Sequence, residues 1–225
     1  MDQAHLDIAG AARFFLDSCD VTEPWVDIEA MASAWGIAVI DGARSTVSHT
    51  TITVDARKEE AGRRFDLAHE MGHLIAEHVG LDRHCERTAS SIASATLMPD
   101  APWKRDLDGS GWDLEHLTER YGVSLEVAAR RASEVRGAVC SAWEGDRLVG
   151  RWRSPWLHGR GFSRRRVPVW ERELAQDCQH DACHLREGEA RAWVGLQRVW
   201  VVTPVDGWEQ LTEERSPVRR RWRGR

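Results

Sequence analysis

Two histidines and a glutamate stand at a spacing that suits metal-dependent hydrolysis. The stretch HEMGH places His69 and His73 four residues apart, with Glu70 between them. On a helix, residues four apart lie on one face about one turn apart, so both imidazoles can reach one ion. In this kind of motif the glutamate does not bind the metal but takes a proton from a zinc-bound water. The spacing therefore predicts His69 and His73 as zinc ligands and Glu70 as the general base.

A catalytic zinc has three protein ligands and leaves its fourth position to water, so the motif needs a third ligand. The metzincin spacing is excluded, because Ala76 and Val79 stand where it requires Gly and His. The candidates that follow the motif are His78, His84, Cys85 and Glu86. A second helix that returns antiparallel after a short loop brings its first turn beside the zinc helix, and a first turn favours a carboxylate. Glu86 is therefore the favoured third ligand, with His84 as its rival.

The surrounding segments predict the elements that must position these residues. The apolar spacing is helical through HEMGH, and a second helix follows in CERTASSIASATLM, ended by Pro99. Two β-branched stretches before the zinc helix, GIAVIDG and STVSHTTITVD, predict two short strands. Further upstream we expect a helix capped by Thr22 that runs to about Trp35. After Pro99 we expect a polar loop and then two helices joined at Gly122, the second capped by Ser124.

The helix with the motif and the helix after it together resemble the ImmA/IrrE family of zinc metallopeptidases. The family pattern is Arg-Phe-x-x-Ala-His-Glu-x-Gly-His, then a Glu-initiated, Ala-rich helix that closes on Leu-Met-Pro. The matching residues are Arg64, Phe65, Ala68, His69, Glu70, Gly72 and His73, then Glu86, Ala89, Ala93, Leu97, Met98 and Pro99. The resemblance covers roughly residues 22–136. The chain departs from the family at Ile92, where a Phe is usual, and at Thr88, where an acid is frequent; neither is a ligand or the base.

The resemblance implies a fold, an activity and a partner. The expected fold class is α+β: a zincin-like helical domain with a small antiparallel sheet, followed by a Trp-rich β-containing C-terminal region. The expected activity is zinc-dependent cleavage of a helix-turn-helix repressor of the XRE type, which relieves repression under stress or when a mobile element is induced. Zn²⁺ is the expected cofactor, and Mn²⁺ or Fe²⁺ would fit the same ligands. No residue is assigned to oxyanion stabilisation; Tyr121 and His116 are weak candidates.

Two other functions stay open on this sequence. One is a catalytically silent protein that binds a regulator or DNA and keeps the zincin fold as a scaffold. Its DNA contacts would come from the helical pair around Gly122 or from the tail RSPVRRRWRGR, which has six Arg in 11 residues and no acid. The other is a peptidase that acts on a toxin–antitoxin partner. Glu70 favours a peptidase, because a protein that only binds has no need of the base.

Composition narrows the class of protein. The net charge of 31 − 36 = −5 gives no general attraction to nucleic acid or to an anionic membrane. No apolar run approaches the roughly 18 residues of a spanning helix, and the first residues do not form a signal segment. Five Cys, an odd number, do not suggest a disulfide framework. We therefore expect a cytoplasmic protein without a membrane partner.

Tryptophan usage indicates how the chain is organised. Eight of the 12 Trp lie after residue 140, where helical spacing gives way to strand-like spacing in GRWRSPW and RVWVVTPV. This shift predicts a metallopeptidase domain over residues 1–137 and a Trp-rich region of unknown role over 138–214, its Trp side chains filling a core. A sensor or substrate-recognition role is our hypothesis for that region. The basic tail, residues 215–225, is expected to be disordered.

A second group of metal-ligand residue types lies in the C-terminal region. The segment CQHDACH brings together Cys178, His180, Cys183 and His184. Sulfur and imidazole at this density could hold a structural zinc. However, the spacing matches no common zinc finger, and one short segment rarely supplies four ligands at tetrahedral angles. Incidental loop residues are the favoured interpretation.

Overall fold

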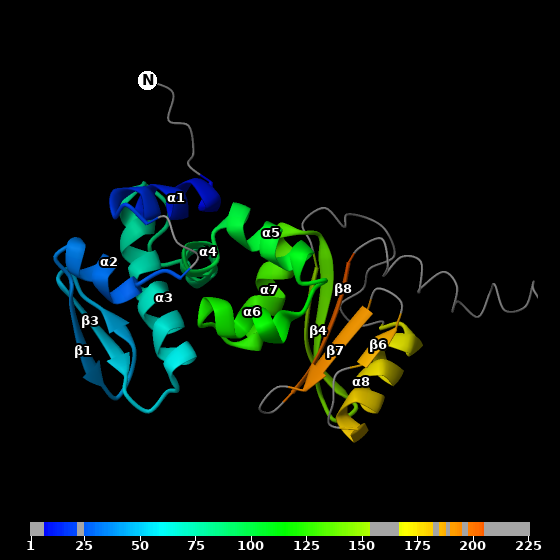
Figure 1. Cartoon of the computed structure of the whole chain (residues 1–225). Coiled ribbons are helices and arrows are strands. Elements are labelled where there is room, and N and C mark those ends of the chain that lie inside the picture. The colour runs from blue at the N-terminus through cyan, green and yellow to red at the C-terminus, as the bar shows by residue number, and fades with distance from the viewer. Residues whose placement is uncertain are drawn as a thin grey trace, which may run out of the picture. The chain divides into compact units, whose positions relative to one another are not determined.

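The computed structural model describes residues 7–21, 25–153, 167–181, 185–187, 190–194 and 198–204 of the 225-residue chain (Figure 1). The chain divides into two compact units, Met1–Val127 and Ala128–Arg225. This division lies within helix α7 (Leu125–Val135), whereas the sequence predicts a boundary at 137/138. No helix among the described residues is both long and apolar enough to cross a membrane.

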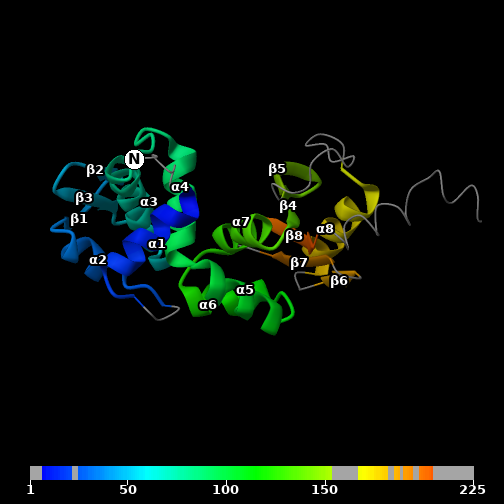
Figure 2. The same ribbon diagram turned by 90° about the horizontal axis from the view of Figure 1, so that it is seen from above.

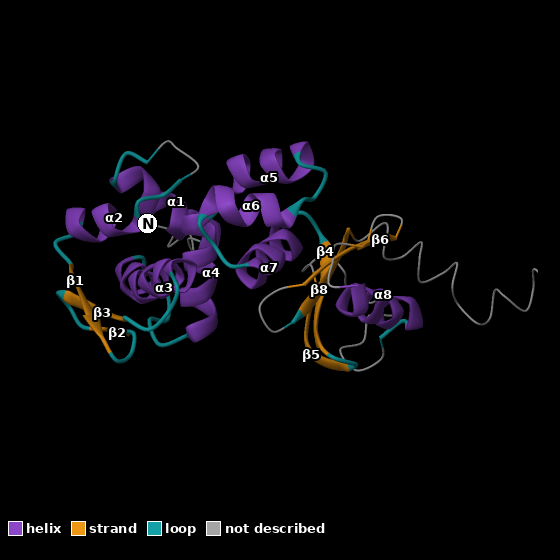
Figure 3. Cartoon of the chain, turned by 60° about the horizontal axis from the view of Figure 1, so that its bottom comes forward, coloured by secondary structure: helices purple, strands orange, loops and turns teal. Residues whose placement is uncertain are grey.

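The first unit is built around one long helix, α3 (Glu60–His78). Figure 3 shows α3 between a small sheet and the other long helix beside it, α4 (Glu86–Leu97). Both helices occur where the sequence predicts them. The other elements of this unit are α1 (Ile8–Ser18), α2 (Ile28–Ala34), β1 (Ala38–Gly42), β2 (Thr46–Val47), β3 (Thr51–Asp55), α5 (Asp100–Gly109) and α6 (Leu114–Tyr121).

The small sheet has the strand order β1-β3-β2 and is mixed. The expectation of an antiparallel sheet is correct for β2 and β3 but wrong for β1 and β3, which pair in parallel from Ala38↔Thr51 to Gly42↔Asp55. The chain reverses direction twice between β1 and β3, so these two strands run the same way. The second β-branched stretch forms two strands rather than one, and Ser48 closes the turn between them by accepting from the Thr51 backbone N–H at 3.1 Å.

Helix α2 begins later than the sequence predicts. Its cap is Asp27, whose carboxylate accepts from the backbone N–H of Ala30 at 3.0 Å. The predicted cap, Thr22, lies outside the described residues. Trp25 and Val26 precede the helix and contact Arg64, whose guanidinium lies 3.9 Å from the centre of the Trp25 ring.

Arg64 of α3 links three parts of the first unit. Besides its contact with Trp25, it donates to the backbone carbonyls of Val26 at 2.9 Å and Gly122 at 3.2 Å. Gly122 has a φ of 59° and ends α6, as the sequence predicts. A Cβ at this position would lie 2.4 Å from the Trp25 ring, so the junction has room only for glycine. The Ser124 hydroxyl accepts from Val127 N–H at 3.4 Å, in the capping position expected for α7.

The expected polar loop after Pro99 is instead helix α5. Two apolar residues four apart, Trp103 and Leu107, are both fully buried. Pro102 is tolerated because the first helical turn has no internal partner for its missing N–H. With only two apolar residues among charged ones, the sequence shows no clear amphipathic period. The structure shows that both apolar side chains lie on the buried face of the helix.

The second unit contains a five-stranded antiparallel sheet with the order β5-β4-β8-β7-β6. Helix α8 (Val169–Asp181) packs on one face of this sheet (Figure 2). The strands are β4 (Ala138–Glu144), β5 (Arg147–Arg153), β6 (Leu185–Glu187), β7 (Ala190–Val194) and β8 (Val199–Pro204). With this sheet, the expected α+β class and β-containing C-terminal region are confirmed.

Tryptophan fills the interior of the second unit, as predicted. Trp143 and Trp170 pack between the sheet and α8, and Trp200 stacks on Trp152 with ring centroids 5.5 Å apart. Beneath α8, Arg151 and Glu171 form an ion pair of 2.6 Å with both side chains 1% exposed. Three other tryptophans, Trp156, Trp208 and Trp222, and the whole basic tail lie outside the described residues.

Helices α3 and α4 touch backbone to backbone at Gly72 and Ala89. A Cβ on Gly72 would lie 2.6 Å from the carbonyl oxygen of Ala89 and 3.1 Å from its Cα. Both obstacles are backbone atoms, so no side-chain rotation could relieve the clash. Any larger residue at position 72 must push the two helices apart.

We predict that Gly72→Ala lowers the free energy of unfolding by about 1–3 kcal/mol, the usual effect of overpacking a tight interior. Gly62→Ala, the same change on the same helix, is the matched control, because its Cβ would meet only ordinary contacts at 3.5 Å or more. Since alanine is the better helix former, this control should be neutral or stabilising by up to about 1 kcal/mol. Urea denaturation of both variants measures the difference. Equal stability of the two would contradict a tight contact at Gly72.

Candidate metal centre

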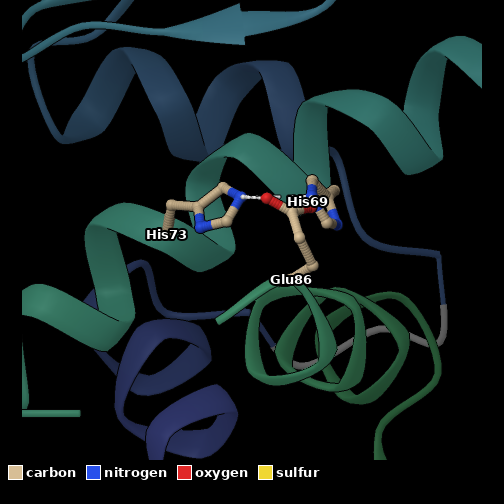
Figure 4. Close-up of side chains that lie close together, drawn as sticks. All are labelled: His69, His73 and Glu86. Atoms are coloured by element: carbon tan, nitrogen blue, oxygen red, sulfur yellow. Dashed lines mark hydrogen bonds and ion pairs between the residues drawn. The ribbon is translucent and has the colours of Figure 1, made fainter. Parts of the chain in front are cut away.

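Three side chains from α3 and α4 point toward one another (Figure 4). The Nε2 atoms of His69 and His73 are 3.1 Å apart on one face of α3. Glu86, the first residue of α4, places one carboxylate oxygen 3.0 Å from His69 Nε2 and the other 3.6 Å from His73 Nε2. Among the described residues, these three are the one group of at least three His, Cys, Asp or Glu side chains whose donor atoms converge.

The dimensions and chemistry of the group fit a zinc ion. A tetrahedral ion with bonds of about 2.0–2.2 Å keeps its ligand atoms about 3.3–3.6 Å apart. The two Nε2 atoms are 3.1 Å apart, and the two Glu86 oxygens lie 3.0 Å from His69 Nε2 and 3.6 Å from His73 Nε2, all close to that range. Two imidazoles and one carboxylate are also ligands that zinc accepts in catalytic sites.

The hydrogen bonds of the two imidazoles orient their Nε2 atoms. His73 Nδ1 lies 2.6 Å from the backbone carbonyl of Arg83, which can only accept, so Nδ1 carries the proton and Nε2 a free electron pair. His69 Nδ1 lies 3.2 Å from the Ser90 hydroxyl. Burial lowers the pKa of His69, and His73 beside it lowers it further, which favours the neutral imidazole that binds metals. The Nε2 atom of His73, the Glu86 carboxylate and, in its neutral form, the Nε2 atom of His69 can all offer electron pairs to one point. A cation at that point would stabilise this arrangement.

Sequence reasoning missed the groups that hold the ligands. Ser90 lies on α4 four residues after Glu86, a spacing that puts both on one helix face. Arg83 contributes its carbonyl from the loop between α3 and α4, and its guanidinium pairs with Glu77 of α3 at 2.6 Å. The four-residue spacing of Ser90 from Glu86 is a sequence signal that could have identified Ser90. No sequence signal identifies the Arg83 carbonyl, because every residue has a backbone carbonyl.

Glu70 lies beside the ligand group without belonging to it. It follows His69 on α3, and the residue is 9% exposed. Burial raises the pKa of its carboxyl; His73 opposes this shift, while Glu86 adds to it. A carboxyl whose pKa is raised, next to a metal position, is suited to exchanging protons with a reacting water.

The other candidates for third ligand lie elsewhere. His84, the rival of Glu86, is exposed and is not part of the converging group. His78 stacks on Phe14 with ring centroids 5.3 Å apart, on the side of α3 that faces α1. Cys85 occupies the N-cap of α4 and does not join the group. The structure therefore brings Glu86, and none of its alternatives, to the histidine pair.

The two weak candidates for oxyanion stabilisation do not lie in the ligand group. The Tyr121 hydroxyl donates to Asp106 at 2.9 Å, and the residue is fully buried against Trp103. Burial raises the pKa of Tyr121, and the Asp106 carboxylate raises it further. His116 is exposed on α6. The Tyr121 hydroxyl therefore links α6 to Asp106 of α5, which is a structural role.

The described part of the CQHDACH segment does not form a second metal centre. Cys178 is fully buried in the apolar core beneath α8. Cys183 and His184 lie outside the described residues, as does the side chain of His180. A thiol inside an apolar core behaves as a small apolar group, so Cys178 is poorly placed to bind a metal.

We predict one zinc per chain in the purified protein, lost or weakened in His69→Ala and in Glu86→Ala. Each change removes one of the three converging ligands. His84→Ala is the matched control, two residues from Glu86 but outside the group, and should retain the metal. Elemental analysis gives the metal-to-protein ratio. If His84→Ala lost the metal and Glu86→Ala retained it, the third ligand would be His84 and not Glu86.

The geometry agrees with comparisons to known proteins. A structural search finds a Mycobacterium tuberculosis transcriptional regulator with a TM-score of 0.63 and 16% identity, covering 92% of this chain and 77% of that chain. At this identity the likeness concerns the fold, and it includes residues of both units. No curated protein matches the sequence. The family model of the IrrE N-terminal-like domain, a peptidase family, matches residues 27–133. These matched residues contain the histidine pair, Glu70 and Glu86, so the match to the IrrE N-terminal-like domain agrees with the resemblance seen in the sequence.

Proposed function

We propose that this chain is a zinc-dependent endopeptidase. The observation that carries the proposal is the convergence of His69, His73 and Glu86, with the buried Glu70 next to them. Two ligands and a base on one helix, with a third ligand from the next helix, form the usual arrangement of a hydrolytic zinc site. The match of residues 27–133 to the model of a peptidase family supports the same activity.

Each residue has a distinct role in the proposed reaction. His69, His73 and Glu86 are the residues that would hold the ion. A zinc ion bound there supplies Lewis-acid chemistry, because it lowers the pKa of water and polarises a scissile carbonyl. Glu70 removes a proton from the attacking water and passes it to the leaving amine. Burial of Glu70 favours its protonated form, which the second of these transfers requires.

The ligand group is open on the side of Glu86. The Glu86 side chain is 78% exposed, whereas His69 and His73 are 17% and 10% exposed. Solvent therefore reaches the group on the side of Glu86, at the start of α4. Such access suits a peptide segment of another protein better than a small molecule enclosed in a cavity.

We infer a helix-turn-helix repressor of the XRE type as the substrate. Support comes from the two linked motifs that this chain shares with ImmA/IrrE peptidases. A toxin–antitoxin partner is the alternative substrate for the same chemistry. The XRE-type repressor encoded nearest to the gene of this chain is the first substrate to test.

A second function has one observation in its favour. The solved structure that resembles both units of this chain is described as a transcriptional regulator. A regulator without peptidase activity could keep the same fold and act by binding. Retention of Glu70, which such a protein does not need, favours the peptidase.

We predict that Glu70→Gln binds zinc like the wild type but cleaves the repressor about 10²–10⁴-fold more slowly, the contribution expected of a general base. Glutamine keeps the size of the side chain and cannot accept the proton. Cleavage is followed by intact-mass measurement of the repressor, and zinc by elemental analysis. Glu60→Gln, an exposed change on the same helix, is the control and should cleave at the wild-type rate.

The outcomes separate the two functions. Wild-type activity in Glu70→Gln would show that this residue is not the base. Absence of cleavage by the zinc-loaded wild type, together with tight binding of the repressor, would favour the regulator. Cleavage of an antitoxin but not of a repressor would support the peptidase activity and show that the proposed substrate is wrong.

A further inference from the structure

One face of α4 contacts both nitrogens of the His69 ring. Glu86 lies 3.0 Å from Nε2, and Ser90, four residues later, lies 3.2 Å from Nδ1. Residues four apart on a helix share a face, so both reach the same imidazole from one side of α4. A single helix thus supplies a proposed metal ligand at one end of the ring and a hydroxyl at the other.

The two histidines differ in how Nδ1 is held. His73 donates to the Arg83 backbone carbonyl, an acceptor that no substitution of a side chain removes. His69 instead depends on the Ser90 side chain, because that hydroxyl is the partner of its Nδ1. A hydroxyl can accept or donate, and only as an acceptor does it keep the proton on Nδ1 and leave the electron pair of Nε2 for a metal. The second partner of a metal-binding histidine orients its ring in this way.

We propose that Ser90 is the positioning residue of His69. Its hydroxyl accepts the Nδ1–H bond, selects the tautomer with a free Nε2, and fixes the ring plane toward His73 and Glu86. Ser90 does not touch the metal or the substrate; it acts through His69. This inference rests on the proposed metal site, and goes beyond it by assigning a role to a residue outside the ligand set.

The test is the affinity for Zn²⁺, measured by competition with a chromophoric chelator. Ser90→Ala should bind Zn²⁺ about 10–100-fold more weakly, the usual effect of losing the second partner of a metal ligand. Ser90→Thr keeps the hydroxyl and should restore an affinity close to that of the wild type. Ser91→Ala is the matched control, because it is the same change at the next position of the same helix. An affinity of Ser90→Ala equal to that of Ser91→Ala would overturn the inference.

A second measurement does not depend on the folding of any variant. In the Zn²⁺-loaded wild type labelled with ¹⁵N-histidine, the Nδ1–H of His69 should exchange slowly with water, because Ser90 accepts it. The Nδ1–H of His73, bonded to the Arg83 carbonyl, is an internal reference. Slow exchange at His73 with unprotected exchange at His69 would overturn the role of Ser90.

The design separates this inference from the proposed function. If neither the wild type nor Ser90→Thr binds Zn²⁺, both the metal site and the role of Ser90 are wrong. If the wild type binds and His69→Ala does not, while Ser90→Ala binds like the wild type, only the role of Ser90 is wrong. Weak binding in Ser90→Ala with rescue in Ser90→Thr supports both.

Discussion

The candidate metal centre depends on the backbone contact between Gly72 and Ala89. Gly72 lies directly before His73 on α3, and Ala89 lies one turn after Glu86 on α4. The Ala89 carbonyl oxygen lies 2.6 Å from the position of a Cβ at residue 72, so the two helices leave no room for a side chain there. A carboxylate has a short reach, so Glu86 can meet the histidine pair only when the first turn of α4 is this near. The same closeness places Ser90 against the other nitrogen of His69.

Arg64, in the first half of α3, connects this helix to two neighbouring segments of the first unit. The stack on Trp25 and the bonds to the Val26 and Gly122 carbonyls join α3 to the start of α2 and to the end of α6. Both carbonyls lie at the ends of helices, where no backbone N–H of a helix or strand is available to donate to them. The Arg64 guanidinium supplies these hydrogen bonds instead. In the second unit the Arg151–Glu171 pair has a comparable role. A buried charge is unfavourable without its partner, so the pair links Glu171 of α8 to Arg151 of β5 inside the unit.

The mistakes of sequence-based prediction in this chain have identifiable causes. Helix α5 was hidden because only Trp103 and Leu107 carry its apolar face, too few for a period to be recognised among charges. The start of α2 is predicted too early because Thr22 and Asp27 are both acceptable caps, and local sequence does not reveal that Trp25 packs on Arg64, far along the chain. The parallel pairing of β1 with β3 depends on strand order, which no local pattern specifies.

By itself, the sequence determined the α3 motif, because the four-residue spacing of His69 and His73 has one consequence on any helix: both side chains share a face. It also determined that a second helix begins at Glu86 and that tryptophans fill the C-terminal core. Only the tertiary structure shows that Glu86, and not His84, lies beside the histidine pair, that Tyr121 bonds to Asp106, and that Ser90 contacts His69. The physical reason is that periodicity describes one element at a time. The distance between two elements is set by packing, here by the absence of a side chain at Gly72.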